Sequence, residues 1–354
     1  TSVMGVSGEI KALQLQAGVQ SVSEGVNGLF VRGGSAGQNL FVLDGMELMN
    51  PSHLMGIYSV FNPLTTGALD VYKGNAPVEL ADHLSSTIIV RSEQPQKGNA
   101  TFAGSIGNIS STLALKGISR DEKWSYVFGF RRSYLEVLQL LSSLFIKGDK
   151  NYFNHSRYNF YDANGLLQWH PTKTTSLALS YYSGQDYFRI NDAKVNCNAG
   201  TDWGNRGACL SFQYSPVADC VVKHSIDYSS VYSSFDGELY ENTLSFKSNY
   251  AKKKKKNGVI YQYKSHRLSA GVDFFFSTAT PQNMVCYQPD DTIAKRMKFQ
   301  NRGIVLYAGD NVRLRDNIEL YGGVRFTANT AISQFSDSNS TNYSWAPVIA
   351  LSIR

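Results

Sequence analysis

The chain has 354 residues, of which 42% are hydrophobic, 12% aromatic and only 18% charged. Abundant aromatics with a low net charge exclude an intrinsically disordered chain, and 4 cysteines are too few for a disulfide-stapled scaffold of this length. No run approaches the ~18 consecutive apolar residues of a membrane helix. A soluble all-β protein and a membrane β-barrel both remain, because the strands of a barrel need no long apolar run.

The formal net charge of +6 includes a single run of five lysines at residues 252–256. We interpret this run as a solvated turn or strand end rather than a site for nucleic acid or anionic lipid. No RNP, zinc-finger or helix-turn-helix pattern accompanies it, so we expect no nucleic-acid partner. The sequence starts at Thr1 without a basic and then apolar leader, and we therefore expect a mature or trimmed product.

Residues 1–97 mix short helical and strand patterns with many glycines, which predicts a small α+β unit. Apolar spacing predicts a short helix over residues 9–15 that ends near Gly18. Strand patterns follow at residues 28–32, 40–43, 68–74 and 86–91, with a glycine- and serine-rich turn at 33–37. Asp44-Gly45 is a two-residue turn signal before a further short strand at 46–48.

Residues 98–354 are dominated by alternation of apolar and polar side chains. Around residues 123–131, for example, Trp124, Phe128 and Phe130 fall on one face while Ser125 and Arg131 fall on the other. Such patterns continue for about ten residues, aromatics recur near their ends, and short connections alternate with long ones, as in outer-membrane barrels. A soluble sandwich of two sheets is the alternative interpretation.

The alternation predicts about twelve strands, and the chain ends within the last of them. The twelve strands either close among themselves or form part of a larger barrel, because an open edge invites pairing. They are expected near residues 98–107, 110–119, 123–133, 157–170, 174–188, 204–215, 219–235, 240–251, 258–278, 299–314, 316–329 and 342–354.

An ordered series of short motifs marks the first region: residues 31–34 (VRGG), 43–45 (LDG), 50–54 (NPSHL), 56–63 (GIYSVFNP) and 71–74 (VYKG). This series resembles the plug domain of TonB-dependent outer-membrane receptors, particularly the version common in Bacteroidota. The match covers about residues 8–92 closely and extends more loosely into the barrel, best at residues 130–135 (FRRSYL). It departs from the family at Ala17, where a proline usually stands, and at residues 81–83, where Gly-Gly-Arg is typical.

The resemblance implies a fold and a domain order. Residues 1–97 are predicted to form a TonB-dependent receptor plug domain, and residues 98–354 the N-terminal part of an outer-membrane β-barrel. Barrels of the family resemble twenty-two-stranded structures with a plugged lumen. Twelve strands are then about half a barrel, so we expect a fragment or one half of a split barrel that a second polypeptide completes.

The resemblance also implies that the Arg32 guanidinium pairs with carboxylates of the barrel wall and holds the plug in place; the alternative is a solvated turn arginine. We group Gly33, Gly34 and Asp44 with it as latch candidates, although the glycines suit tight turns as well. Glu47, His53 and Lys73 are further polar candidates of the plug. These side chains either face the lumen or cap turns by hydrogen bonds.

No catalytic, metal or cofactor site emerges from the sequence. The histidines lack metal-ligand spacing, and no Ser/His/Asp or paired-carboxylate arrangement appears, so we expect neither an enzyme nor a cofactor. Cys197 and Cys209 lie within one predicted long loop and either form a disulfide there or stay unpaired. Apolar residues at helical spacing predict a short helix at residues 133–145 in an outer loop.

The function that the resemblance implies is energised import of a scarce or bulky solute through a plugged barrel in the bacterial outer membrane. Its partners would be the lipid bilayer, the TonB–ExbB–ExbD system acting through an upstream TonB box that this sequence lacks, and a surface lipoprotein lid. A non-transporting structural or assembly subunit and a soluble β adhesin are the alternatives. The solute cannot be read from the sequence, because specificity lies in loops.

Overall fold

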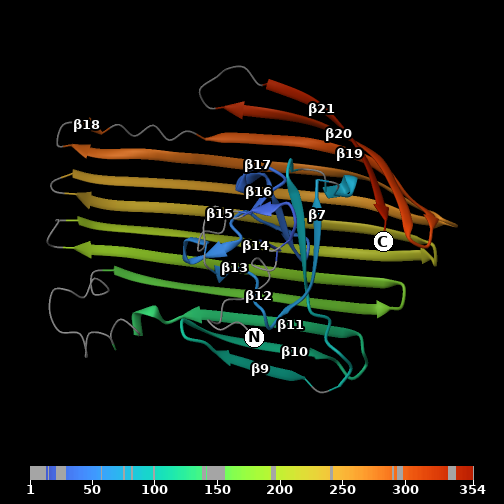
Figure 1. Ribbon diagram of the computed structural model, residues 1–354, viewed down its shortest axis with the longest axis horizontal. Coiled ribbons are helices and arrows are strands. Elements are labelled where there is room, and N and C mark those ends of the chain that lie inside the picture. The colour runs from blue at the N-terminus through green and yellow to red at the C-terminus, as the bar shows by residue number, and fades with distance from the viewer. Residues whose placement is uncertain are drawn as a thin grey trace.

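A large antiparallel sheet with a small N-terminal unit against one of its faces makes up the molecule (Figure 1). The computed structural model describes residues 13–14, 16–20, 29–56, 58–74, 76–80, 83–98, 100–137, 141, 156–192, 197–239, 242–288, 291–292, 298–333 and 340–353. The helix predicted at residues 9–15 lies outside the described residues except for Leu13 and Gln14, which are helical. Of the helix predicted at 133–145, residues 135–137 and 141 are helical, residue 133 ends a strand and residue 134 has no regular structure. The other residues of that range lie outside the described part.

Twelve long strands form the large sheet in simple up-and-down order, so each strand pairs with its neighbours in sequence. The short β18 (Asp291–Thr292) pairs with β17 at one end. The twelve strands are β9 (Thr101–Ile106), β10 (Ser110–Ile118), β11 (Trp124–Ser133), β12 (Ser156–Thr172), β13 (Thr175–Asp192), β14 (Cys197–Val217), β15 (Cys220–Leu239), β16 (Asn242–Tyr263), β17 (His266–Gln288), β19 (Phe299–Arg315), β20 (Ile318–Ser333) and β21 (Ser340–Ile353).

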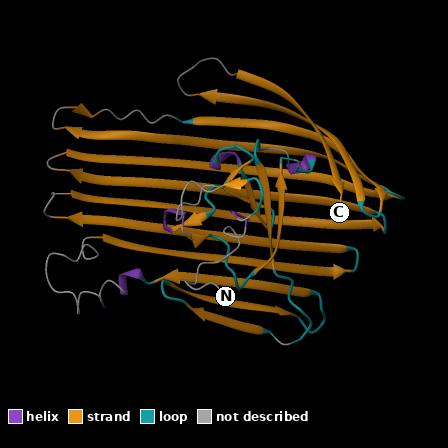
Figure 2. Ribbon diagram, viewed as in Figure 1, coloured by secondary structure: helices purple, strands orange, loops and turns teal. Residues whose placement is uncertain are grey.

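The predicted alternation is confirmed, and it gives the sheet two unlike faces. On β11, Trp124, Phe128 and Phe130 are 41–45% exposed, whereas Ser125 and Arg131 are buried. We call the face that contacts the N-terminal unit the inner face and the opposite face the outer face. In the described residues the sheet packs against the small unit and not against a second large sheet, which removes the sandwich interpretation (Figure 2).

The interpretation of the lysine run as a turn is wrong. Residues 252–256 lie in the middle of β16, which pairs without interruption there with β15 and β17. The turn stands instead after Tyr263, before β17 begins at His266. A run of five lysines shows no alternation of apolar and polar side chains, so the sequence gives no local pattern that would indicate a strand there.

The predicted Cys197–Cys209 disulfide is also wrong. Both residues belong to β14, which begins well before the expected position 204. Twelve positions of extended strand separate their Cα atoms by about 40 Å, whereas a disulfide needs less than about 7 Å. Cys209 is a buried free thiol, and Cys220 is also free.

The N-terminal unit is built on a four-stranded sheet in the order β4-β3-β8-β7. β3 pairs parallel with β8, and the Asp44-Gly45 turn joins β3 to β4 as predicted. Its elements are β1 (Val19–Gln20), β2 (Phe30–Val31), η1 (Ala36–Gln38), β3 (Leu40–Leu43), β4 (Met46–Leu48), β5 (Ser52–His53), η2 (Leu54–Gly56), β6 (Tyr58–Ser59), β7 (Thr66–Lys73), η3 (Val78–Leu80) and β8 (Ser86–Ser92).

The core of this unit continues into the wall formed by the large sheet. Its buried apolar residues, such as Phe41, Met46 and Ile88, form one cluster with Tyr182 and Cys209 of the wall. Contacts run from β4 to β14 and β15, and from η3 to β19 and β20. No helix among the described residues is long and apolar enough to cross a membrane.

Gly45 is required where the turn touches the wall, and this can be tested by Gly45→Ala. Its φ is +92°, and an added Cβ would lie 3.0 Å from the Cys209 Sγ atom. We expect a loss of about 1–2 kcal/mol in the free energy of unfolding, measured by urea unfolding in lipid vesicles. Gly37→Ala is the control, because nothing lies within 4 Å there. Equal stability of the two variants would contradict the proposed close approach.

Candidate functional site

The first contact between the N-terminal unit and the wall centres on the buried His53 of β5. Its Nδ1 lies 2.6 Å from Asp186 Oδ2 of β13, and its Nε2 lies 3.2 Å from Asp162 Oδ2 of β12. The Arg131 Nη2 of β11 lies 2.7 Å from the same Asp162 oxygen. The His53 ring stacks on Phe160 with centroids 4.5 Å apart. Arg131 and the protonated form of His53 would together balance the two carboxylates.

Backbone groups of the unit complete this cluster. Arg131 Nη2 donates to the Ser59 carbonyl at 2.6 Å, and the Leu54 amide donates to Asp186 Oδ1 at 3.0 Å. Burial alone would lower the pKa of His53, but Asp186 and Asp162 outweigh it and raise that pKa above 6.5. The His53 ring thus lies between two wall carboxylates, which favour its protonated form.

The second contact uses Lys252 and Lys256 of the lysine run on β16. Lys252 Nζ lies 2.8 Å from Glu47 Oε2 of the N-terminal unit. Lys256 Nζ donates to the Gly45 carbonyl at 3.2 Å and lies 2.9 Å from Asp227 Oδ1. Burial would raise the pKa of Glu47, but Lys252 and its neighbouring lysines hold it below its usual value. Glu47 is therefore ionised and paired to the wall.

The third contact is a socket for Val78 of η3, which is completely buried. The Tyr321 hydroxyl accepts from the Val78 amide at 2.8 Å, and Arg325 Nη1 donates to the Val78 carbonyl at 2.8 Å. A Cβ added at Gly323 would lie 2.6 Å from a Val78 methyl carbon, and one at Gly309 3.2 Å from the other. Because Gly309 and Gly323 have no side chains, the wall has space there for the Val78 side chain.

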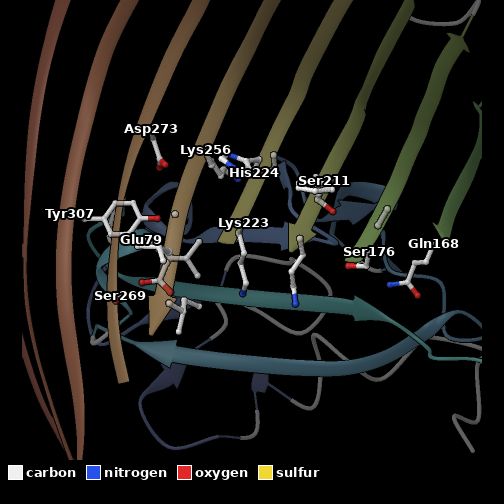
Figure 3. Close-up of a pocket in the computed structure, with 18 residues that line it drawn as sticks. Glu79, Gln168, Ser176, Ser211, Lys223, His224, Lys256, Ser269, Asp273 and Tyr307 are labelled. Carbon is white, nitrogen blue, oxygen red and sulfur yellow. The ribbon is translucent and has the colours of Figure 1, made fainter. Parts of the chain in front are cut away.

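A cavity of about 340 Å³ lies between η3 and the inner face, towards the short-turn end of β12–β17 (Figure 3). Glu79 and Leu80 form its side on the N-terminal unit, and small wall residues such as Ser176, Ser211 and Ser269 line it. Lys223, Lys256, Asp273 and Tyr307 add polar groups. Polar and apolar groups both line this space, which has the size of a small ligand pocket.

The contacts between the unit and the wall among the described residues do not include the latch predicted at Arg32. Arg32 is exposed, and among the described residues it makes no ion pair with a wall carboxylate. Gly33 has a φ of +79° and serves turn geometry, while Gly34 packs on Ser85. The Asp44 carboxylate accepts from Ser92 within the unit, and burial raises its pKa.

Two predicted polar candidates do reach the wall through their side chains, namely Glu47 and His53. Lys73 does not, because its Nζ donates to the Ala17 carbonyl inside the unit. Asp44 contributes only its carbonyl, which accepts from the Ser180 hydroxyl at 2.9 Å. The Asp44-Gly45 turn therefore meets the wall through its backbone.

Sequence reasoning missed the wall partners: Arg131, Asp162, Asp186, Asp227, Lys252, Lys254, Lys256, Asp273 and Arg325. Outside the lysine run a usable signal existed, since each of these residues is charged and lies at an inner-face position of an alternating strand. Among the described residues no cluster of His, Cys, Asp and Glu could hold a metal ion.

Comparison with known proteins identifies the fold. No family model matches, and no curated protein matches. Several solved structures do match. The copper transporter OprC has a TM-score of 0.70 and 14% sequence identity, over 97% of this chain and 57% of that chain. Pseudomonas aeruginosa FpvA bound to heterologous pyoverdines has a TM-score of 0.69 and 13% identity, over 99% of this chain and 53% of that chain. BauA, the ferric preacinetobactin receptor of Acinetobacter baumannii, has a TM-score of 0.64 and 12% identity, over 92% of this chain and 55% of that chain.

The fold is that of TonB-dependent outer-membrane receptors. The N-terminal unit corresponds to a plug and the large sheet to part of a barrel wall. The chain spans about half the length of these solved structures.

Seating of the plug should weaken as the pH rises. Because the folded pKa of His53 is raised, its contribution is complete below about pH 6.5 and is lost as the pH passes the folded value. In vesicles, we expect the urea concentration at the midpoint of plug release to decrease as the pH is raised from about 6 to about 9 in the native protein. In His53→Gln this urea midpoint should not change with pH. His170→Gln, at an exposed strand end, should keep the native profile. A pH-dependent midpoint that persists in His53→Gln would contradict the assignment.

The Glu47–Lys252 pair should behave as a buried ion pair. Glu47→Gln or Lys252→Met alone should cost about 3 kcal/mol of unfolding free energy, because each leaves a buried charge without its partner. The double variant should lose less than the sum in a double-mutant cycle by urea unfolding. The exposed Asp70–Arg91 pair is the control, and its cycle should give less than about 1 kcal/mol. Additive losses at Glu47 and Lys252 would contradict a direct pairing.

Proposed function

We propose that the chain belongs to a TonB-dependent transporter of the bacterial outer membrane that imports a scarce or bulky solute. The observation that carries this is the plug–wall interface, which joins its two sides through buried but charge-balanced polar contacts. Polar interfaces of this kind characterise contacts that separate, whereas permanent ones are more apolar.

Rehydration of each partner lowers the free-energy cost of separation. When the plug moves away, His53, Glu47 and their wall partners regain the water that burial removed, which offsets much of the lost Coulomb attraction. The cavity beside η3, which Lys223, Asp273 and Tyr307 line together with apolar side chains, already provides space for water at the short-turn end of the wall. A pull on the plug from that side would widen an existing space.

The partners of such a transporter are part of the proposal. The energy would come from the inner-membrane TonB–ExbB–ExbD system acting on a segment upstream of residue 1. Further strands, in the same or a second polypeptide, would complete the barrel, because a sheet in lipid must close. A surface lipoprotein lid and the Bacteroidota origin rest on the sequence resemblance.

Uptake assays test the proposal directly. Cells that express the protein receive labelled ferric siderophores, copper, cobalamin or oligosaccharides in turn, with and without a working TonB system. We expect uptake of one class that stops without TonB. TonB-independent accumulation, or none in any class, would favour a structural subunit of the outer membrane.

A reversible lock of the plug gives a sharper result. A Cβ added at Gly45 lies 3.0 Å from Cys209 Sγ, close to the separation across a disulfide, so Gly45→Cys should cross-link to the native Cys209. Uptake should fall at least about tenfold on oxidation and recover with a reductant, because a cross-linked plug cannot move to open a path through the lumen. Gly45→Cys with Cys209→Ser is the matched control and should not respond. Full uptake by the cross-linked protein would show that the plug need not leave this contact.

A further inference from the structure

The outer face of β16 interrupts the apolar pattern of the sheet. Lys253 and Lys255 alternate with the lysines that bind the plug and are exposed on the outer face, with Tyr261 and Tyr263 of the same strand. Successive side chains of a strand point to opposite faces, so the run of five lysines serves both. Lys254, between the two, is 3% exposed and pairs with Asp273.

Aromatic and aliphatic side chains surround these two lysines. Lys253 stands between Tyr228 of β15 and Phe276 of β17. Lys255 stands between Ile226 and Phe274 on the same strands. All four neighbours are exposed large hydrophobic residues. Two ammonium groups therefore lie within a surface that is otherwise suited to acyl chains, where an unpaired lysine is unfavourable.

A third cation lies in the same row. Arg302 of β19 is exposed and is the register partner of Phe276. Two strand spacings separate it from Lys253, which is about 10 Å. Among the described residues, none of Lys253, Lys255 and Arg302 takes part in an ion pair. The three cations surround Phe274 and Phe276 without a counter-charge from the chain.

The position along the strand places these cations at one boundary of the membrane. Lys253 lies ten positions from Tyr263, which precedes the short turn into β17. At about 3.3 Å per residue and a tilt of about 40°, this is about 25 Å along the membrane normal, the height of the apolar band of such barrels. Short turns face the periplasm in these barrels, so the lysines reach the outer leaflet.

We propose that Lys253, Lys255 and Arg302 bind the phosphorylated headgroup of a lipid of the outer leaflet. The phosphate oxygens accept hydrogen bonds from the two ammonium groups and from the Arg302 fork. The acyl chains lie on Phe274, Phe276 and the adjacent apolar side chains. Both halves of the ligand are needed: the cations require an anion, and the apolar surround requires acyl chains rather than a free phosphate.

Native mass spectrometry of the whole protein in mild detergent, titrated with diphosphoryl lipid A, tests this site. We expect Lys253→Gln/Lys255→Gln to bind lipid A about 30-fold more weakly, at about fivefold for each basic residue. Lys253→Arg/Lys255→Arg should retain binding, because the charge is kept. Unchanged binding by the glutamine variant would overturn the proposal.

Matched arms identify the occupant. Lys173→Gln/Lys264→Gln removes the same charge from exposed positions at the short turns and should leave lipid A binding unchanged. Inorganic phosphate alone should not compete. Loss of lipid A binding in this control would show general charge attraction, and competition by inorganic phosphate would show a free-anion site. Either result would overturn the lipid assignment. Phosphatidylethanolamine bound as tightly as lipid A would also overturn it.

Discussion

The architecture depends on neutralising charges on the inner face of the wall. Asp162, Asp186 and Lys252 lie on strands where the alternation points them inward, and a buried charge left without a partner costs several kcal/mol. The plug supplies the missing partners, His53 and Glu47. Plug and wall are therefore electrostatically complementary, and each stabilises the placement of the other.

Successive side chains of each wall strand point to opposite faces of the sheet, so alternate residues face the plug and the outer surface. On β16, Lys252 and Lys256 contact the plug and Lys254 pairs with Asp273 of the wall, while Lys253 and Lys255 face outward among aromatic residues. The same rule places Arg131 under the plug and Phe130 on the outer surface of β11. Since a register slip of one residue would exchange the faces, the buried ion pairs also specify register.

Local patterns predicted most of the fold, because a period of two and a turn signal such as Asp44-Gly45 are legible within a few residues. The site was less predictable, since His53 and Asp186 are 133 positions apart and meet only through the whole sheet. Glu47 and His53 were correctly singled out as polar plug residues, but their partners were not. Arg32, which the family resemblance singled out, is exposed and has no carboxylate partner among the described residues, and the cysteine pair was misplaced because β14 extends into the expected loop.

In the proposed membrane placement, the outer face contacts lipid while the plug covers the inner face. Trp345 lies on the outer face of β21 and Trp203 packs near Tyr158 on the inner face, so single-tryptophan variants compare the two. In vesicles of lipids brominated along the acyl chains, Trp345 fluorescence should be strongly quenched and Trp203 fluorescence should not. Equal quenching of both, or quenching of Trp203 alone, would contradict the account.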